Sequence, residues 1–282
     1  MHINYWGAVK GSTAGRVGGG LLLAALAAGA AAPLWPHAPE AFSQAVLQPP
    51  SAAHWLGTND VGQDVMAQLL HGARRSLAVA LAAGCLTTAL SFLTGAGAAL
   101  GGRRVDAMLM RLTDAMLAVP TIVIVIVLAA YVPLRFAGLV LVIALTGWAA
   151  GARIVRAQVL ILREKAHVLA ARTFGASTRH LLFRHLLPDI APVLLVSFIQ
   201  SARRAVLLEA GLAFLGVGDP TAVSWGMMLQ QALQFYYTPA WSWWLLPPGI
   251  ALALTLLSFL LLGSVLEPLL DPRLRRDEHA GD

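Results

Sequence analysis

Residues 169–188, LAARTFGASTRHLLFRHLLP, form a basic segment between two apolar stretches. Each neighbouring stretch is long enough to cross a bilayer, which takes roughly 20 residues. Good helix formers fill most positions from 162 to 174, Gly175 can end that helix, and Ser177 can cap another. Pro188 suits the first turn of a following span. The pattern predicts a helix, a tight turn, a second helix and then a membrane span.

The composition indicates that lipid surrounds most of the chain. Of its 282 residues, 58% are apolar and 12% are charged, and the mean hydropathy is +0.71. A soluble domain averages about 25% charged residues. The net charge of +6 comes from basic residues between apolar runs, which indicates membrane orientation and not nucleic-acid binding. The single cysteine, Cys85, cannot form an internal disulfide.

Six apolar runs predict an all-α integral membrane protein with transmembrane helices at about residues 18–35, 76–100, 112–132, 136–154, 190–215 and 243–266. A short amphipathic helix ending at Arg75 is expected before the second span. Pro120 lies inside the third span, where neighbouring helices can satisfy the freed carbonyl. Asp114 is expected to pair with Arg111, three residues away. A cleaved signal peptide is the alternative for the first run.

The runs divide the chain into three expected parts. Residues 1–75 hold the N-terminal tail, the first span and an outer segment. Residues 76–266 form a core of five helices with a cytoplasmic loop at about 155–189, and residues 267–282 form a polar tail.

Basic residues are distributed unequally between the two sides of the predicted bundle. The side without the long loop holds only Arg74, Arg75 and Arg135. Because loops rich in Lys and Arg stay in the cytoplasm, we expect both termini and residues 155–189 to be cytoplasmic. The side predicted to be cytoplasmic holds Lys10, Arg16, Arg103, Arg104, Arg111, Arg153, Arg156, Arg163, Lys165, Arg172, Arg179, Arg184, Arg273, Arg275 and Arg276.

Residues 169–188 resemble the cytoplasmic coupling motif of ABC-importer permeases. That motif reads Glu-Ala-Ala, three residues, Gly, nine residues, Ile, one residue, Leu-Pro. Leu169 stands in place of the Glu and His185 in place of the Ile, so one charge contact with a partner is missing. The residues that match at the motif's spacing are Ala170, Ala171, Gly175, Leu187 and Pro188.

Further segments are similar to the dipeptide, oligopeptide and nickel permease family. Asn59 and Gln63 depart from the usual Asp and Arg of its opening signature. The order of the segments and the single extra N-terminal span look most like the C-type subunit of a permease pair. The similar segments are residues 56–65, 72–77, 110–114 with Pro120, 209–216, 224–226 and 270–274.

The resemblance implies a permease of a type I ABC importer for peptides, or alternatively for nickel or a metal chelate. It also implies a multi-pass protein of the bacterial inner membrane. Its partners would be a second homologous permease, two ATP-binding subunits, and a periplasmic or lipid-anchored binding protein. Rigid-body motion would switch the open side of the pathway. A secondary transporter or channel is the alternative from another class, and it tends to carry buried acids and inverted repeats.

The positions of the lysines are independent evidence that this chain does not hydrolyse ATP by itself. A phosphate-binding loop reads Gly-x-x-x-x-Gly-Lys-Ser/Thr. The only lysines are Lys10 and Lys165, and neither follows a glycine. We therefore expect no enzymatic activity, no catalytic residue and no directly bound cofactor, with ATP and magnesium held by partner subunits.

Arg203 and Arg204 lie within the fifth apolar run, where an arginine costs at least about 2.5–3.5 kcal/mol. One alternative is that they pair with Glu209 or with another helix. The other is that Arg203, Arg204 and Glu209 line the pathway, where an arginine contacts a substrate carboxylate. Asp60 and Asp64 either contact the binding protein or cap a short helix. No metal site is expected from the histidines considered, which are His54, His71, His167, His180 and His185.

Overall fold

The computed structural model describes residues 5–131, 134–219 and 221–267. Every secondary-structure element named within these ranges is helical. The polar tail at 267–282 and the signature at 270–274 lie almost wholly outside the described residues. The helices are α1 Tyr5–Gly11, α2 Thr13–Ala31, the 3-10 turn Ala32–Leu34, α3 Val65–Leu100, α4 Gly102–Ala118, α5 Thr121–Tyr131, α6 Phe136–Leu162, α7 Ala166–Thr173, α8 Thr178–Leu181, the π turn Leu182–Leu186, α9 Leu187–Phe214, α10 Trp225–Leu233, α11 Trp241–Trp244 and α12 Leu246–Leu266.

Five helical segments of the described chain are long and apolar enough to cross a membrane, or six when the bent pair of α4 and α5 counts as one. The pair bends by 78° at its break. Val119 is extended there because the ring of Pro120 disfavours the helical conformation for the residue before it. The third span is therefore broken in two and is not the continuous helix that was expected.

Helix α3 is continuous over 36 residues, which makes it about 54 Å long at 1.5 Å per residue. The expected short helix ending at Arg75 and the second span are thus one element, and the expected boundary after residue 75 falls inside it. Gly72 does not end the helix. An added Cβ there would lie 2.9 Å from Cδ1 of Trp225, so this glycine allows close packing.

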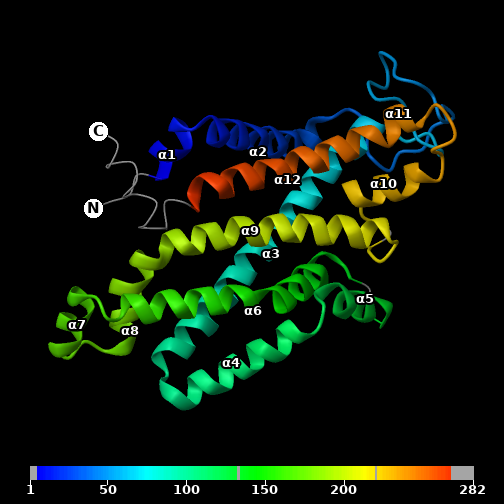
Figure 1. Ribbon diagram of the computed structural model, residues 1–282. Coiled ribbons are helices and arrows are strands. Elements are labelled where there is room, and N and C mark those ends of the chain that lie inside the picture. Colours follow the sequence, from blue (N-terminus) through cyan, green and yellow to red (C-terminus); the bar gives the residue numbers. More distant parts are fainter. Residues whose placement is uncertain (1–4, 132–133, 220, 268–282) are drawn as a thin grey trace.

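Helix α3 packs most extensively against α6 and α9, as Figure 1 shows. Small residues set these contacts. A Cβ added to Gly84 would lie 3.1 Å from Ala202 of α9, and one added to Gly95 would lie 2.5 Å from the carbonyl oxygen of Ala152 in α6. Such close backbone approach is typical of helix packing in membranes. Helices α2 and α12 pack together on the flank of this core, and α2 also contacts α3.

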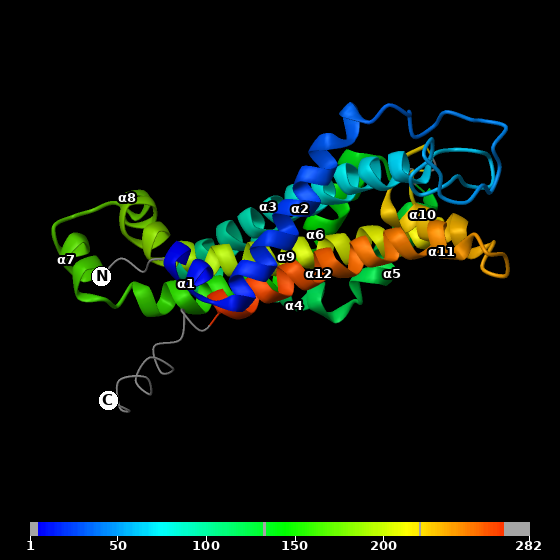
Figure 2. The same ribbon diagram turned by 90° about the horizontal axis from the view of Figure 1, so that it is seen from above.

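The two ends of the bundle carry different structures (Figures 1 and 2). Helices α7 and α8 project from one end as a hairpin. The connection between α2 and α3 gathers with α10 and α11 at the opposite end. The candidate coupling segment, which forms the hairpin, therefore lies far from the connection between α2 and α3.

Candidate functional site

The turn of the hairpin follows the prediction made from Gly175. Its φ of +82° lies in the left-handed region, which glycine adopts without strain. The amide of Gly175 donates to the carbonyl of Arg172 at 3.0 Å, and the amide of Ala176 donates to that of Ala171 at 3.1 Å. These two bonds form a Schellman motif that ends α7. The side chain of Ser177 accepts from the amide of His180 and caps α8, as expected.

The hairpin has one face tied to the bundle and one open face. Val168 and Leu181 are buried in a cluster with residues of α3, α6 and α9. On the open side, the side chain of Phe174 is 90% exposed, and Leu169 and Phe183 are also exposed. Exposed apolar groups gathered on one projecting element indicate a contact surface for another protein.

The six motif residues lie together on this hairpin or at its junction with α9. Ala171 and Leu187 are half-buried, which leaves the other members open to a partner. The four exposed members are Leu169, Ala170, Gly175 and Pro188.

A continuous helical path joins the hairpin to the membrane helix. Residues Thr178–Phe214 form one unbroken helical segment, so the separate helix and span predicted at Pro188 are a single element. The π turn explains how the proline fits. The amide of Leu187 donates to the carbonyl of Leu182, one residue beyond the α-helical partner, and this locally altered register accommodates a residue without an N–H.

Ion pairs and hydrogen bonds fix the base of the hairpin. Lys165 Nζ lies 3.3 Å and His167 Nε2 lies 3.4 Å from Oδ2 of Asp189 at the start of α9. Arg163 Nη1 donates to the carbonyl of Ala99 in α3 at 3.1 Å. The base of the hairpin is therefore attached to α9 through Asp189 and to α3 through Ala99.

Two ion pairs tie α4 to α6. Arg156 binds both carboxylate oxygens of Asp106, at 2.5 and 2.6 Å. Asp114 pairs with Arg153 of α6, so the expected local pair with Arg111 is wrong. The physical reason is that α4 lies against α6, which brings a second guanidinium to the carboxylate.

Glu209 is buried in a polar network between α3, α9 and α10. Its side chain is 2% exposed, and Ser76 Oγ donates to its Oε2 at 2.9 Å. Ser224 also lies beside this carboxyl group. Arg75 lies nearby and pairs with Asp219 Oδ2 at 3.6 Å. Ser76 therefore holds this acid, and the expected pairing with Arg203 or Arg204 is wrong.

A cavity of about 260 Å³ opens beside Glu209. Acidic, basic and amide side chains line it, which gives it both signs of charge. Its polar lining includes Arg75, Glu209, Asp219, Gln230 and Gln231. The sequence reasoning missed Arg75 and Asp219 because they meet only in the folded chain.

Arg203 is half-buried and Arg204 is exposed. Within the described ranges, neither guanidinium forms an ion pair or a side-chain hydrogen bond, and neither lines the cavity beside Glu209. Arg204 lies on the exposed side of α9 with Leu207 and Phe214. An unpaired arginine in an apolar helix is costly in free energy. Both guanidinium groups are therefore available to bind a polar or charged group outside this chain.

Asp64 caps α3, in line with one of the two alternatives. Its side chain is 2% exposed, and its Oδ1 accepts from the amide of Ala67 at 2.7 Å. Such a buried carboxylate is closed to a binding protein. Asp60 is half-buried in the turn before α3, and its contact with a binding protein stays a prediction.

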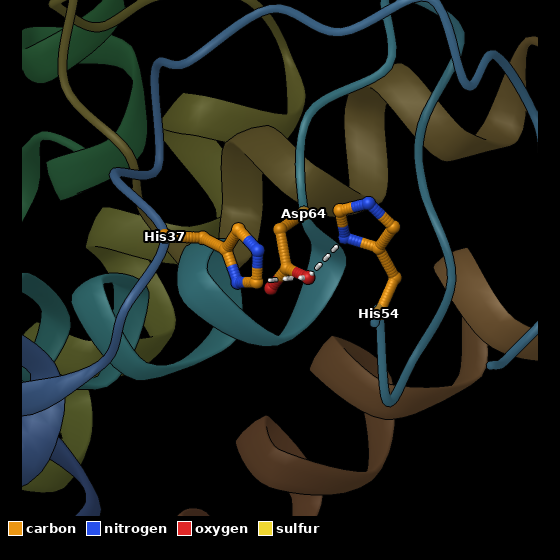
Figure 3. Close-up of side chains that lie close together, drawn as sticks. All are labelled: His37, His54 and Asp64. Atoms are coloured by element: carbon orange, nitrogen blue, oxygen red, sulfur yellow. Dashed lines mark hydrogen bonds and ion pairs between the residues drawn. The ribbon is translucent and has the colours of Figure 1, made fainter. Parts of the chain in front are cut away.

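Two histidines converge on Asp64, which the sequence reasoning did not foresee (Figure 3). His54 Nδ1 lies 2.8 Å and His37 Nδ1 lies 3.9 Å from Asp64 Oδ2. The expectation that the histidines form no cluster is therefore wrong for His54. The residues are far apart in sequence and show no ligand spacing, so no local signal reveals them.

The chain matches the family model for the inner membrane component of binding-protein-dependent transport systems over residues 77–276. It is 43% identical to a putative peptide permease protein of Brucella suis, over 86% of this chain and 81% of that protein. It is 36% identical to the oligopeptide transport system permease protein of Bacillus subtilis, over 81% of this chain and 75% of that protein. The dipeptide transport system permease protein of Bacillus subtilis is 35% identical, over 81% of this chain and 71% of that protein. The helical bundle, the projecting hairpin and these similarities together show that the chain belongs to the family of binding-protein-dependent ABC-transporter permeases.

Proposed function

We propose that this chain is one of two permease subunits of a peptide importer and that its hairpin docks an ATP-binding subunit. The observation that carries the proposal is the open apolar face at residues 169–183, joined to α9 by an unbroken helix. The relatives are named as peptide, oligopeptide and dipeptide permeases, which supports peptides as the substrate. Nickel or a metal chelate is the alternative cargo.

ATP hydrolysis by the subunits docked at the hairpin would supply the energy for transport. ATP and magnesium would be held by two partner subunits, and this chain would bind neither. A partner that shifts the hairpin would move α9 with it, because α8, the π turn and α9 form one helical segment. Ion pairs at Asp189 would carry the same displacement to α7. Alternating access would follow as a rigid-body movement of packed helices.

The distribution of basic residues supports a cytoplasmic hairpin. Arg172, Arg179 and Arg184 all lie on the hairpin or its π turn. With the hairpin and both termini in the cytoplasm, the connection between α2 and α3 would face the periplasm at the opposite end. A periplasmic or lipid-anchored binding protein would deliver substrate to that end, and Asp60 would lie within its reach.

The charges beside Glu209 suit a zwitterionic substrate. A free peptide carries an ammonium group and a carboxylate, and the cavity offers Arg75 together with Glu209 and Asp219. Arg203 and Arg204 would provide a further contact for a carboxylate along the surface shared with the second permease. We therefore propose that peptides contact both the cavity beside Glu209 and the exposed side of α9 that carries Arg204.

Phe174→Glu tests the docking surface. Burying a phenylalanine is worth about 1.5–3 kcal/mol, so its loss should weaken association by roughly 10- to 150-fold. The measurement is the amount of ATP-binding subunit that co-purifies with the permease pair. Tyr237→Glu is the matched control, because Tyr237 is 72% exposed and lies between α10 and α11, the helices at the opposite end.

We expect Tyr237→Glu to leave co-purification unchanged. If Phe174→Glu retains the ATP-binding subunits and normal uptake, the docking proposal fails. Uptake into vesicles that carry the assembled importer, compared for labelled dipeptides, oligopeptides and Ni²⁺, decides between the two cargoes. Uptake of Ni²⁺ with no uptake of peptide would overturn the peptide assignment.

A further inference from the structure

We propose that His37, His54 and Asp64 form a binding site for a divalent transition-metal ion such as Zn²⁺ or Ni²⁺ (Figure 3). The site would lie at the end of the molecule opposite the hairpin. It would join the connection after α2 to the first turn of α3. The inference is independent of the proposed transport function, since it rests on side-chain geometry alone.

The three potential ligand atoms already lie close to the separations that a bound ion needs. All of them fall within 4.8 Å of one another. Oδ2 of Asp64 is 2.8 Å from His54 Nδ1 and 3.9 Å from His37 Nδ1. Ligands about 2.1 Å from a tetrahedral ion are about 3.4 Å apart. A small opening of the first pair and a small closing of the second would produce that arrangement.

Neighbouring groups hold the carboxylate of Asp64 in position. Its Oδ1 accepts from the amide of Ala67 at 2.7 Å and from Nε1 of Trp35 at 3.2 Å. These bonds occupy one oxygen and turn the other toward the two imidazoles. Outer hydrogen bonds of this kind orient the ligands of known metal sites. The cap of α3 would therefore keep the carboxylate ready for an ion.

An aromatic pair brings the two histidine segments together. The rings of Trp35 and Trp55 meet edge to face with centroids 5.0 Å apart. Trp35 precedes His37 by two residues, and Trp55 directly follows His54. The ring centroids of His37 and His54 are themselves only 5.0 Å apart. Packing therefore holds the ligand-bearing segments in place without help from the ion.

His37 supplies a second observation that points to a ligand. Its Nδ1 is enclosed and has no hydrogen-bond partner among the described atoms. A buried polar atom without a partner is rare and calls for a specific explanation such as an ion. Neutral imidazole nitrogens and a carboxylate oxygen are ligands that Zn²⁺ and Ni²⁺ accept. An anion is a poor occupant, because the buried carboxylate would repel it.

An ion could reach the site from solvent. The side chains of His37 and His54 are 39% and 18% exposed, whereas that of Asp64 is 2% exposed. Three protein ligands leave at least one coordination position for water. The ion would thus lie at the base of an open loop, with the helix cap behind it.

Calorimetric titration of the full chain with Zn²⁺ and with Ni²⁺ tests the proposal. The chain is purified in detergent through a tag that contains no histidine. We expect one ion per chain and at least tenfold weaker binding in His37→Gln and His54→Gln. Glutamine at 54 can still donate a hydrogen bond to Asp64, so the loop is expected to keep its fold. Circular dichroism and size-exclusion profiles check that fold.

His71→Gln is the matched control at the same end of the molecule, because His71 is outside the cluster. It should bind the ions as the unmodified chain does. A second readout is the rise in unfolding temperature on adding Zn²⁺, which should disappear in His37→Gln. Absence of binding by the unmodified chain at micromolar ion overturns the proposal. Full binding by both cluster variants, or loss of binding only in His180→Gln at the hairpin, also overturns it.

Discussion

Substituting Gly175 by alanine isolates the contribution of the hairpin turn. The φ of Gly175 is +82°, and a Cβ added there would meet no atom within 4 Å. Steric overlap with neighbours therefore contributes nothing, and the whole effect comes from the left-handed backbone. That conformation costs an L-residue about 1–2 kcal/mol.

This free-energy cost can appear in two ways, as a loss of folding stability or as a change in the shape of the turn. If the turn keeps its shape, the folded chain loses about 1–2 kcal/mol of stability. If the turn relaxes, the Schellman bonds of Gly175 and Ala176 break and the open face of the hairpin moves. The fraction of correctly shaped hairpin then falls by up to a factor of about 5–30, and the affinity for the ATP-binding subunit falls with it.

The assay measures ATP hydrolysis by the reconstituted importer, stimulated by the substrate-loaded binding protein. Gly102→Ala is the matched control. The φ of Gly102 is +80°, its Cβ would also meet nothing within 4 Å, and it is the first residue of α4, outside the hairpin. Both variants should lower the unfolding temperature similarly, but only Gly175→Ala should reduce the stimulated rate. An equal loss of stimulation in both variants, or a Gly175→Ala variant that loses neither thermal stability nor stimulation, would refute the reasoning.

Three further predictions concern the membrane helices and the loop beside the cavity. Gly95→Leu should destabilise the bundle by about 1–3 kcal/mol, because an added Cβ would lie 2.5 Å from the carbonyl oxygen of Ala152; unchanged thermal unfolding in detergent would contradict this. Arg204→Gln should raise the KM for dipeptides with a free C-terminus and leave C-amidated ones unaffected in vesicles with normally assembled importer; unchanged uptake and selectivity would end the pathway assignment. The pKa of Asp219 is lowered, first by the hydrogen bond from the Thr221 hydroxyl, so its ionised form stabilises the fold above the ordinary value of 3.8 and this contribution is lost as the pH falls through the lowered pKa. The difference in unfolding temperature between the unmodified chain and Asp219→Asn should therefore shrink between pH 7 and pH 3, and a constant difference would contradict the assignment.

Local features of the chain were predictable because their physics is local. A run of about 20 apolar residues partitions into lipid wherever it occurs, so the helical class followed from hydropathy. The turn at Gly175 and the cap at Ser177 were predictable because backbone freedom and capping act within a few residues. The same holds for the capping alternative at Asp64.

Helix boundaries were predicted less well because packing decides them. Gly72 looks like a weak point in a helix, yet Trp225 lies against it and α3 continues. Pro120 was expected inside a span and instead separates α4 from α5. At Pro188 a new helix was expected to begin, but the π turn before it keeps the helical segment continuous. The sequence marks these positions, but neighbouring elements determine the outcome.

Side-chain partners depended on the tertiary structure throughout. Glu209 bonds to Ser76 across 133 residues of sequence, and Asp114 pairs with an arginine of α6. His37 and His54 meet at Asp64 only because the loop folds back onto the first turn of α3. Hydropathy and turn chemistry are properties of short stretches, so they could be read directly from the residues. Which charged or coordinating groups face one another depends on the rotation and register of every packed helix, and these emerge only when the whole bundle forms.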